Sequence, residues 1–385
     1  MMKVLHLGKY YPPEPGGIEY FLKNLLAATR WFFENHAIVA DKGQMHREES
    51  ETGITVYHRS QIGTLFLTPI LPGLFGFLHK LRKKHEFGCI VLHAPNPMTT
   101  AALAVTDFIS PLREKLVIFY HGDILVDSPL QKIAYFFFRH LEDRVFLRAD
   151  RFFAHSPNLV RHSQVLGRYQ GMVDIVPSTV PDDWPAVTAE DEQEASRIRK
   201  EAGKPIVLFV GRLVPYKGLD TLVASAKMVR DVVFILVGDG PLEGDLKQRA
   251  AEQGVSDRFV FAGRVGRLKP YYLACDVFVL PSNSPVEAFG LVLVEAMSFG
   301  KPVVTSDLPT GVTYVNEDGK TGFTFPVRDS IRLAEVMNRL LSDEPLRNRL
   351  GKNARERVER EFASAVVGRK FAEAIENLCK GGHTR

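Results

Sequence analysis

Short runs of apolar residues alternate with longer amphipathic segments along the whole chain. Such alternation is typical of strands and helices that follow one another in a parallel α/β sheet. The runs of the first half, expected to be strands, cover residues 3–8, 36–40, 54–58, 88–93, 116–120, 151–154 and 173–176. The second half repeats the rhythm over residues 206–210, 233–237, 259–262, 277–280, 302–305 and 323–325. Each half is therefore predicted to form a doubly wound parallel sheet.

A proline-rich and acidic stretch separates the two halves. It contains Pro177, Pro181 and Pro185, followed by the acidic run 190–192. Clusters of this kind are typical of linkers. The chain has 385 residues, more than one hydrophobic core usually supports. We therefore expect a first domain over residues 1–180 and a second domain over residues 181–364.

Bulk composition excludes several classes of protein. Hydrophobic residues make up 45% of the chain and charged residues 24%, as in an ordinary soluble protein. The net charge of +4 is too small for this length to indicate nucleic acid, and no basic stripe with interleaved aromatics occurs. Three widely spaced cysteines, Cys89, Cys275 and Cys379, suggest neither a disulfide framework nor a metal knuckle. Because no signal peptide or membrane-spanning run is apparent, we expect a cytoplasmic protein.

The stretch 282–300 carries two glutamates among apolar residues. A helix from about Gly290 to Phe299, closed by Gly300, would be apolar on every face and therefore buried. Glu295 in such a helix needs hydrogen-bond donors, and a ribose diol offers two. Glu287 precedes the helix, where the helix dipole favours an anion. The residues alone leave two interpretations open: a ligand site, or a helix-start acid and a carboxylate paired with a core arginine.

Further polar motifs follow predicted strands, at the edge where doubly wound sheets bind ligands. Gly16 and Gly17 open a helix, and adjacent glycines let a phosphate or sugar approach the backbone. His121 follows another strand. Arg212 and Lys217 could together neutralise a diphosphate. Each also has a plain structural explanation, namely a loop turn, a satisfied buried histidine, and solvated surface cations.

The spacing of Glu287 and Glu295 resembles the E-x7-E element of the retaining family 4 glycosyltransferases. Further elements stand in that family's order: Pro15-Gly16-Gly17-Ile18-Glu19, His121-Gly122-Asp123, Val210-Gly211-Arg212 with Lys217-Gly218, and Phe261-Ala262-Gly263-Arg264-Val265. The resemblance covers most of the chain. It implies the GT-B architecture, in which two Rossmann-like doubly wound parallel-sheet domains face each other across a cleft. It also implies that the last helix, about residues 365–385, packs back on the first domain.

The same resemblance implies a role for each matching residue. Arg212 and Lys217 would assist departure of a diphosphate, Glu287 would contact sugar hydroxyls, and Glu295 would contact the ribose. His121 would lie near the reacting carbon. The other residues expected to contact substrate are Gly16, Gly17, Glu19, Asp239, Arg264, Val265, Ala288, Phe289, Gly290 and Leu291.

The expected reaction is transfer of a mannose-like or glucose-like hexosyl group from a GDP- or UDP-sugar to a glycan or a polyprenyl-diphosphate-linked acceptor. No D-x-D sequence occurs, so neither a metal nor another cofactor is expected. One alternative is a GT-B nucleotide-sugar epimerase, which would need acid/base carboxylates in the first domain. Another is a non-catalytic protein that binds a nucleotide sugar.

Two apolar segments of the first domain border basic residues. Residues 65–78 run into the basic run 79–85, and residues 135–140 read Tyr-Phe-Phe-Phe-Arg-His. Aromatic and aliphatic groups beside cations suit the surface of an anionic bilayer. We expect peripheral contact with the inner face of the cell membrane. The alternative is that the phenylalanines belong to the core and the lysines to a solvated helix face.

Overall fold

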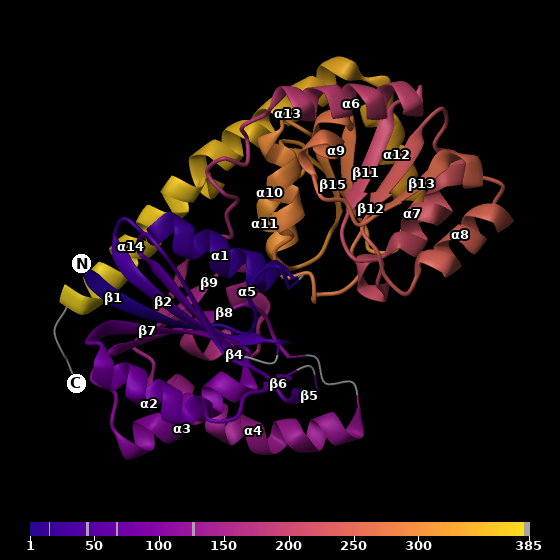
Figure 1. The fold of residues 1–385 in the computed structure, drawn as a ribbon. Coiled ribbons are helices and arrows are strands. Elements are labelled where there is room, and N and C mark those ends of the chain that lie inside the picture. The colour runs from indigo at the N-terminus through magenta and orange to yellow at the C-terminus, as the bar shows by residue number, and fades with distance from the viewer. Residues whose placement is uncertain (15, 44–45, 67, 125–127, 381–385) are drawn as a thin grey trace. The chain divides into compact units, whose positions relative to one another are not determined.

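The computed structural model describes residues 1–385 except 15, 44–45, 67, 125–127 and 381–385. Pro15 of the glycine motif, Leu67 of the first apolar segment and the end of the predicted last helix lie outside the described residues. The chain divides into two compact units (Figure 1). Unit 1 comprises Met1–Pro181 and Ser364–Arg385, and unit 2 comprises Asp182–Ala363.

The described part of unit 1 holds an eight-stranded sheet in the order β10-β9-β8-β7-β1-β2-β4-β3. Its strands are β1 (Met2–Leu7), β2 (Phe33–Asp41), β3 (Arg47–Glu51), β4 (Ile54–Ser60), β7 (Phe87–Ala94), β8 (Lys115–Tyr120), β9 (Arg151–Ala154) and β10 (Val173–Ile175). All the predicted runs fall on strands of this sheet. Only β3 is antiparallel to its neighbour among these described strands, and its exposed sequence REESE carries no apolar signal. It covers the edge of the sheet with charge.

Helices cover both faces of this sheet (Figure 1). One face carries α1 (Gly17–Thr29) and α14 (Ser364–Lys380), and the other carries α2 (Leu74–Lys84), α3 (Pro97–Ile109) and α4 (Pro129–Arg148). Successive residues of a strand point to opposite faces. Val4 and Val91 accordingly pack with Phe371 of α14, whereas Leu5 and Leu92 pack in the core beneath α2 to α4. The last helix is therefore part of the core of unit 1.

The apolar segment over residues 65–78 is not one element. It begins at the tip of a hairpin formed by β5 (Gly63–Leu65) and β6 (Thr68–Ile70), and it ends in α2. A short helix, α5 (Pro157–His162), follows β9. Across all the described residues, no helix combines the length and the apolar character needed to cross a bilayer.

Unit 2, described throughout, holds a six-stranded parallel sheet in the order β13-β12-β11-β14-β15-β16. The strands are β11 (Ile206–Val210), β12 (Val233–Val237), β13 (Phe259–Gly263), β14 (Val277–Leu280), β15 (Val303–Ser306) and β16 (Gly322–Phe325). The helices are α6 (Ala189–Ala202), α7 (Leu219–Ser225), α8 (Glu243–Glu252), α9 (Lys269–Ala274), α10 (Leu291–Ser298), α11 (Gly311–Val315), α12 (Ser330–Ser342) and α13 (Glu344–Arg357). The expectation of two doubly wound parallel sheets is confirmed.

The strand order of each sheet reverses at one point. In unit 2 the chain moves outward from β11 in one direction and then returns to start again at β14 on its other side. In unit 1 the corresponding pair is β1 and β7. Ligands of doubly wound sheets bind outside the carboxyl ends of the strands at such a point. The loops after these four strands are therefore where functional side chains should be sought.

Candidate functional site

An ion pair joins the two strand ends at which the sheet of unit 2 reverses. Lys217 follows β11 and Glu287 follows β14, and the lysine Nζ lies 2.5 Å from Glu287 Oε2. The hydroxyl of Ser282 donates to the same carboxylate oxygen at 2.9 Å. Burial lowers the pKa of Lys217, but the Glu287 carboxylate more than offsets this, so the pKa lies above its usual value. Glu287 is therefore held by a buried cation, a partner that neither interpretation of the sequence included, and its contact with sugar hydroxyls stays a prediction.

A glycine makes this pairing possible. Gly218 has a φ of +65°, and a Cβ built there would stand 2.0 Å from the carbonyl oxygen of Pro281. Any other residue would push the loop after β11 away from the loop after β14. Gly218 therefore lets the 3-10 turn Pro215–Lys217 present its lysine to Glu287.

Arg212, the other predicted cation, differs from Lys217. It follows β11 almost directly, it is exposed, and among the described residues its guanidinium has no ion-pair partner. Its charge acts on Lys217 and lowers the pKa of that lysine, so the two cations are near each other. The strand end therefore carries one neutralised cation and one available cation.

Asp239 and Arg264 pair with each other instead of standing free. Asp239 follows β12 and Arg264 follows β13, and Arg264 Nε lies 2.7 Å from Asp239 Oδ2. Both side chains are largely exposed, so the pair contributes little to stability. It joins two neighbouring loops at the same edge of the sheet, with Val265 directly after it.

Glu295 lies on α10, as predicted, but its partner differs from the alternative considered. Tyr272 of α9 donates its hydroxyl hydrogen to Glu295 Oε2 over 2.6 Å, so the carboxylate does not pair with a core arginine. Burial raises the pKa of Glu295 to about 7, while the Tyr272 hydrogen bond and the charge of Lys217 oppose this rise. Glu295 also keeps some solvent exposure. A half-buried carboxylate with a free oxygen is thus available to accept further hydrogen bonds.

Contacts with Gly311 and Phe362 hold the segment between the two glutamates. The carbonyl of Ala288 accepts a hydrogen bond from the N–H of Gly311 at 2.8 Å, and the ring of Phe289 packs edge-on against Phe362. Gly290, at a φ of +79°, turns the chain into α10. The first N–H groups of a helix, which here include that of Leu291, have no acceptor inside the helix. The contact of residues 288–291 with substrate stays a prediction, and the N–H groups at the start of α10 are donors that it could use.

The glycine motif of unit 1 is organised by an acidic side chain. A Cβ built on Gly16 would stand 2.0 Å from Oε2 of Glu19, whereas Gly17 is exposed with open space around it. Burial lowers the pKa of nearby Lys9, and the Glu19 carboxylate offsets part of this shift. The Glu19 carboxylate thus lies directly over Gly16, and Gly17 leaves the backbone accessible.

His121 belongs to a row of buried side chains that we call the histidine ladder, comprising His6, His93, His121, His155 and Ser178. The ring nitrogens of successive histidines lie 3.1, 3.0 and 2.7 Å apart, and Ser178 Oγ lies 3.2 Å from His155 Nδ1. Both nitrogens of His121 therefore contact protein partners, Nε2 with His93 and Nδ1 with His155. The proximity of His121 to a reacting carbon stays a prediction, and any contact through a ring nitrogen would have to break the ladder.

The ladder is electrically neutral. Burial lowers the pKa of His6 and His155 to about 3, and it lowers the pKa values of His93 and His121 well below their usual range. The rings of Phe21 and Phe119 pack against the ladder and contribute no charge that could stabilise an imidazolium. These four imidazoles are therefore uncharged at neutral pH.

The sequence motifs did not reveal the other members of the ladder, nor Tyr272 and Ser282. A signal for the histidines exists, since each stands at or just beyond the end of a strand, in LHLG, VLHA, FYHG and FAHS. Alternation along parallel strands then puts all four on one face. Tyr272 and Ser282 carry no comparable signal, because their importance comes from contacts with the two glutamates.

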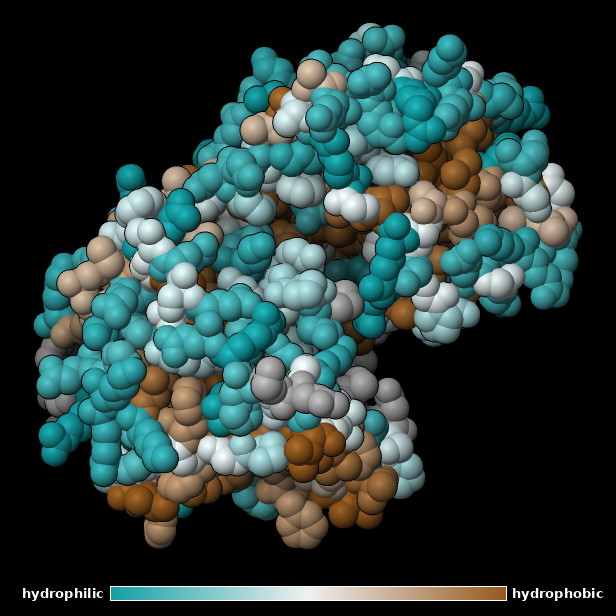
Figure 2. Space-filling model, in the orientation of Figure 1, coloured by the Kyte–Doolittle hydropathy of each residue, from teal (hydrophilic) through white to brown (hydrophobic). Residues whose placement is uncertain are grey.

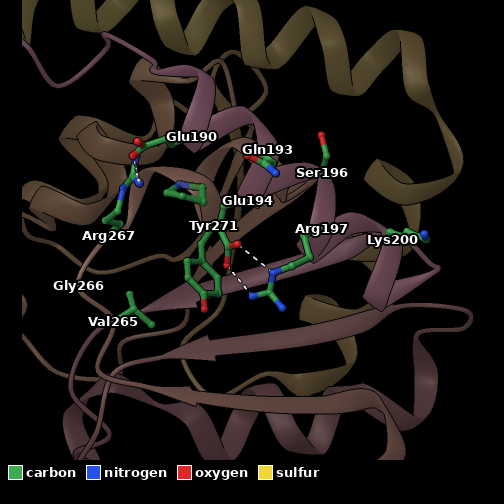
Figure 3. A pocket seen from close by; sticks show the side chains of 11 residues that line it. Glu190, Gln193, Glu194, Ser196, Arg197, Lys200, Val265, Gly266, Arg267 and Tyr271 are labelled. Atoms are coloured by element: carbon green, nitrogen blue, oxygen red, sulfur yellow. Dashed lines mark hydrogen bonds and ion pairs between the residues drawn. The ribbon is translucent and has the colours of Figure 1, made fainter.

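Two other features of the described residues lie away from these strand ends. Figure 3 shows a pocket between α6 and α9 in which Glu194 pairs with Arg197, and Arg267 pairs with Glu190. Its two glutamates pair with two of its three cations, and Val265 is the one predicted site residue among its lining residues.

A second feature is a group of possible metal ligands at the opposite edge of the sheet of unit 1. Glu34, His36 and His85 lie together there. The ammonium of Lys3 lies 3.3 Å from His85 Nδ1 and 3.6 Å from Glu34 Oε1, in the position a cation would take. Lys3 therefore already places a positive charge beside these three side chains.

Two sequence families match the chain. Residues 15–184 match "Glycosyltransferase Family 4" and residues 190–357 match "Glycosyl transferases group 1". A relative from Escherichia coli, O-antigen chain mannosyltransferase C, is 31% identical over 370 residues, which cover 94% of this chain and 95% of the relative. D-rhamnosyltransferase WbpZ of Pseudomonas aeruginosa is 29% identical over 94% of this chain and 93% of its own length.

Solved structures agree on the fold. Sucrose-phosphate synthase from Thermosynechococcus elongatus superimposes with a TM-score of 0.78 at 22% identity, covering 99% of this chain and all of that one. Anabaena Alr3699/HepE in complex with UDP superimposes with a TM-score of 0.76 at 23% identity, covering 98% and 100%. The architecture is therefore GT-B.

The histidine ladder predicts a steep loss of stability in acid. In the unfolded chain histidines bind protons below about pH 6.5, whereas the folded ladder does not. The free energy of unfolding should therefore be fully present above about pH 6.5 and fall as the pH drops towards the lowered pKa values. Each ladder histidine contributes up to about 1.4 kcal/mol per pH unit. Urea unfolding between pH 7.5 and 5.5 measures this slope.

The matched control uses an exposed histidine outside the ladder. His6→Gln removes one titrating group and should reduce the slope of unfolding free energy against pH by up to about 1.4 kcal/mol per pH unit. His140→Gln changes an exposed residue of α4 and should leave the slope unchanged. Equal slopes for the two variants would contradict this account of the ladder.

Proposed function

The chain belongs to the family 4 glycosyltransferases, and from that premise we propose that it is a retaining, metal-independent hexosyltransferase. It moves a mannose-like or glucose-like group from a nucleoside-diphosphate sugar to a glycan or lipid-linked acceptor, in the synthesis of a surface polysaccharide. The observation that carries this proposal is the strand-end site of unit 2. There a buried Lys217–Glu287 pair, an unpaired Arg212 and Glu295 of α10 stand at the reversal of the sheet.

The diphosphate would bind at the positive part of this site. Arg212 offers a planar guanidinium without an ion-pair partner among the described residues, and α10 offers the N–H groups of its first turn. Lys217 adds a second cation close by. Charge that develops on a departing diphosphate would thus meet fixed donors, which is how preorganised sites lower a barrier. With the available Arg212 and the N–H groups of α10, with the paired Lys217 close by, and with no D-x-D sequence, we expect the reaction to need no metal bridge.

The two glutamates would take different parts of the donor. Glu295 has one oxygen on Tyr272 and can accept from ribose hydroxyls with the other. Glu287, oriented by Lys217 and Ser282, would accept from hydroxyls of the sugar. A carboxylate that accepts from an ammonium and a hydroxyl is a weak nucleophile. This supports attack by the acceptor from the side on which the leaving group departs, without a covalent intermediate.

The remaining predicted contacts have supporting positions. Gly17 leaves backbone accessible at the start of α1, with Glu19 and Gly16 shaping that turn. Arg264 and Val265, after β13, would lie beside the nucleotide base, with Asp239 orienting the arginine. His121 would support the sugar from unit 1.

The names of similar proteins support a nucleotide-sugar donor and a surface-polysaccharide acceptor. HepE has been solved with UDP and with UDP-glucose, and the Escherichia coli relative carries the name of an O-antigen mannosyltransferase. A panel of UDP-, GDP- and ADP-sugars, with and without a lipid-linked acceptor, tests the proposal directly. Release of nucleoside diphosphate that depends on acceptor and survives exhaustive chelation supports it. A strict Mg²⁺ or Mn²⁺ requirement contradicts it.

Unit 1 has a surface suited to a membrane-bound acceptor. The outward face of α4 exposes Leu130, Ile133, Phe136, Phe137 and Leu147, and the phenylalanines are 61% and 69% exposed. The alternative that these rings belong to the core is therefore wrong. The end of α3 adds Phe108, whose ring lies 5.5 Å from the guanidinium of Arg144 on α4. Figure 2 shows apolar atoms gathered over this part of unit 1.

Exposed lysines lie on the face of the unit 1 sheet that also carries α4. Lys80, Lys83 and Lys84 of α2 are exposed, and α2 packs against α3. Arg82 is different, because it is paired with Glu114 at 2.7 Å and bonded to the carbonyl of Ser110. An apolar helix face with free lysines beside it fits an anionic bilayer surface. We therefore include contact with the inner face of the cell membrane in the proposal.

The phosphate assignment predicts a loss of turnover in Arg212→Ala. Removing one preorganised charged donor should lower kcat about 10²- to 10³-fold with the fold intact. Arg249→Ala is the matched control, because Arg249 is an exposed arginine of the same unit on α8, paired only with Asp245. Steady-state kinetics with the donor found in the panel decide the matter. Near-normal turnover in Arg212→Ala would remove the assignment.

The nucleotide assignment predicts that donor affinity depends on pH through Glu295. Its raised pKa of about 7 means that the accepting carboxylate is lost as the pH falls below neutrality. The Kd of the nucleotide sugar, whose diphosphate does not titrate here, should rise between pH 8 and 6. Glu295→Gln should bind weakly at every pH and show no such trend, whereas Glu287→Gln should keep it. Calorimetric titration measures all three proteins, and a trend that survives in Glu295→Gln would contradict the role.

The membrane surface predicts binding to vesicles that contain anionic lipid at low salt. Lys80, Lys83 and Lys84 changed together to glutamate should reduce partitioning roughly 100-fold, since each cation contributes about 1 kcal/mol. Phe136→Ser with Phe137→Ser should also reduce it. The charge-matched control reverses the exposed Lys227, Lys247 and Lys320 of unit 2. Cosedimentation that is indifferent to all these changes would favour a soluble acceptor.

A further inference from the structure

The histidine ladder crosses five neighbouring strands of unit 1 on one face of the sheet. Its members stand at or beyond the carboxyl ends of β1, β7, β8, β9 and β10, in the order in which these strands pair. Helix α1 lies over it, and the ring of Phe21 contacts those of His121 and His155 at centroid distances of 5.4 and 4.7 Å. The ring of Phe371, from α14, stacks on His6 at 5.9 Å. The ladder therefore lies beneath the helix that the glycine motif begins.

Hydrogen bonding imposes one direction on the whole row. A neutral imidazole has one donor nitrogen and one acceptor nitrogen. Because each inner ring uses both nitrogens on its neighbours, the tautomer of one histidine determines the tautomer of the next. At one end the ring of His155 contacts Ser178 Oγ and hydrogen-bonds to the backbone of Val176, whereas at the other end His6 Nε2 has no hydrogen-bond partner among the described residues. The tautomer and tilt of His121 are therefore set by groups up to two strands away.

The loop that follows β8 is held at two polar residues, His121 and Asp123. The ring of His121 belongs to the ladder, and the backbone N–H of His121 donates to the carbonyl of Ala94 at 2.8 Å. Asp123 accepts from the hydroxyls of Tyr120 at 2.8 Å and Ser163 at 2.5 Å. Gly122 alone separates these anchors. A row of apolar side chains could fill the same volume, but it would not impose an orientation, because apolar packing is not directional.

We propose that the histidine ladder is a positioning device for glycosyl transfer, in which His6, His93 and His155 hold the His121–Asp123 loop in the one arrangement that the reaction requires. This inference rests on the proposed function, because it assigns these residues an effect on the transfer step. The three histidines touch no substrate in this role. They act through His121, and the effect of each depends on an unbroken row of hydrogen bonds.

The test compares two substitutions at one inner position. Glutamine has a donor and an acceptor and can continue the row, whereas leucine has similar volume and neither group. His93→Leu should lower kcat about 10- to 100-fold with the KM for the donor nearly unchanged, as expected for misplacement of a reacting loop. His93→Gln should recover most of the loss. His6→Leu, two links from His121, should lower kcat as well, and it serves if His93→Leu does not fold.

The control is a buried histidine of the same sheet outside the ladder. His36 lies near the start of β2 with Glu34 and Tyr57 as partners. His36→Leu should lower the melting temperature and leave kcat unchanged. If leucine and glutamine at position 93 have equal effects, or if kcat falls only in proportion to folded protein as in His36→Leu, the ladder is ordinary core and the proposal is overturned.

A second readout separates this inference from the proposed function. The ring-nitrogen NMR signals of His121 should show one neutral tautomer in the wild-type protein and a mixture in His6→Leu. This measurement needs no substrate. A wild-type protein inactive with every donor would refute the proposed function and leave the NMR test standing. Identical His121 signals in both proteins would overturn the proposal that the ladder positions His121.

Discussion

The buried ion pair between Lys217 and Glu287 is the interaction on which the site of unit 2 depends. It joins two loops that are distant in sequence but adjacent in space, since β11 and β14 are neighbours at the reversal of the sheet. Removing one partner of a buried pair leaves an uncompensated charge and costs about 3–5 kcal/mol. The pair therefore fixes the loops strongly. It also cancels one positive charge, so that, under the proposed function, Arg212 and the start of α10 would determine where a ligand phosphate binds.

Unit 1 reaches a comparable rigidity without charge. Its strand ends are tied by imidazoles that burial keeps neutral, and each bond in the row is directional. Under the proposed function, unit 2 would supply cations for a diphosphate, whereas the ladder of unit 1 would orient a loop without adding charge.

Much of this arrangement could be predicted from sequence, because it depends on local pattern. The apolar runs placed both sheets, and Glu287 and Glu295 stood out as carboxylates in an apolar stretch. Pairings between distant residues could not be predicted. Nothing in the sequence links Lys217 to Glu287, or Tyr272 to Glu295, until the strand order is known. The run Phe136-Phe137 gave no indication of its exposure, because an aromatic sequence is the same in a core and on a surface. The polar strand β3 and the short hairpin lacked any periodic apolar signal.

The position of the apolar face of α4 follows from the same topology that builds the site. A helix that follows a parallel strand begins at the carboxyl edge of the sheet and runs back towards the amino edge. Helix α4 begins at Pro129, shortly after the His121–Asp123 loop, so Leu130 and Ile133 lie at the end of the helix nearest that loop. The hairpin tip with the exposed Leu65 likewise follows the carboxyl end of β4. A lipid-linked acceptor held at these side chains would present its sugar at the edge of the sheet where the ladder ends. The proposed contact with lipid and the proposed positioning of the acceptor would thus both follow from one strand direction.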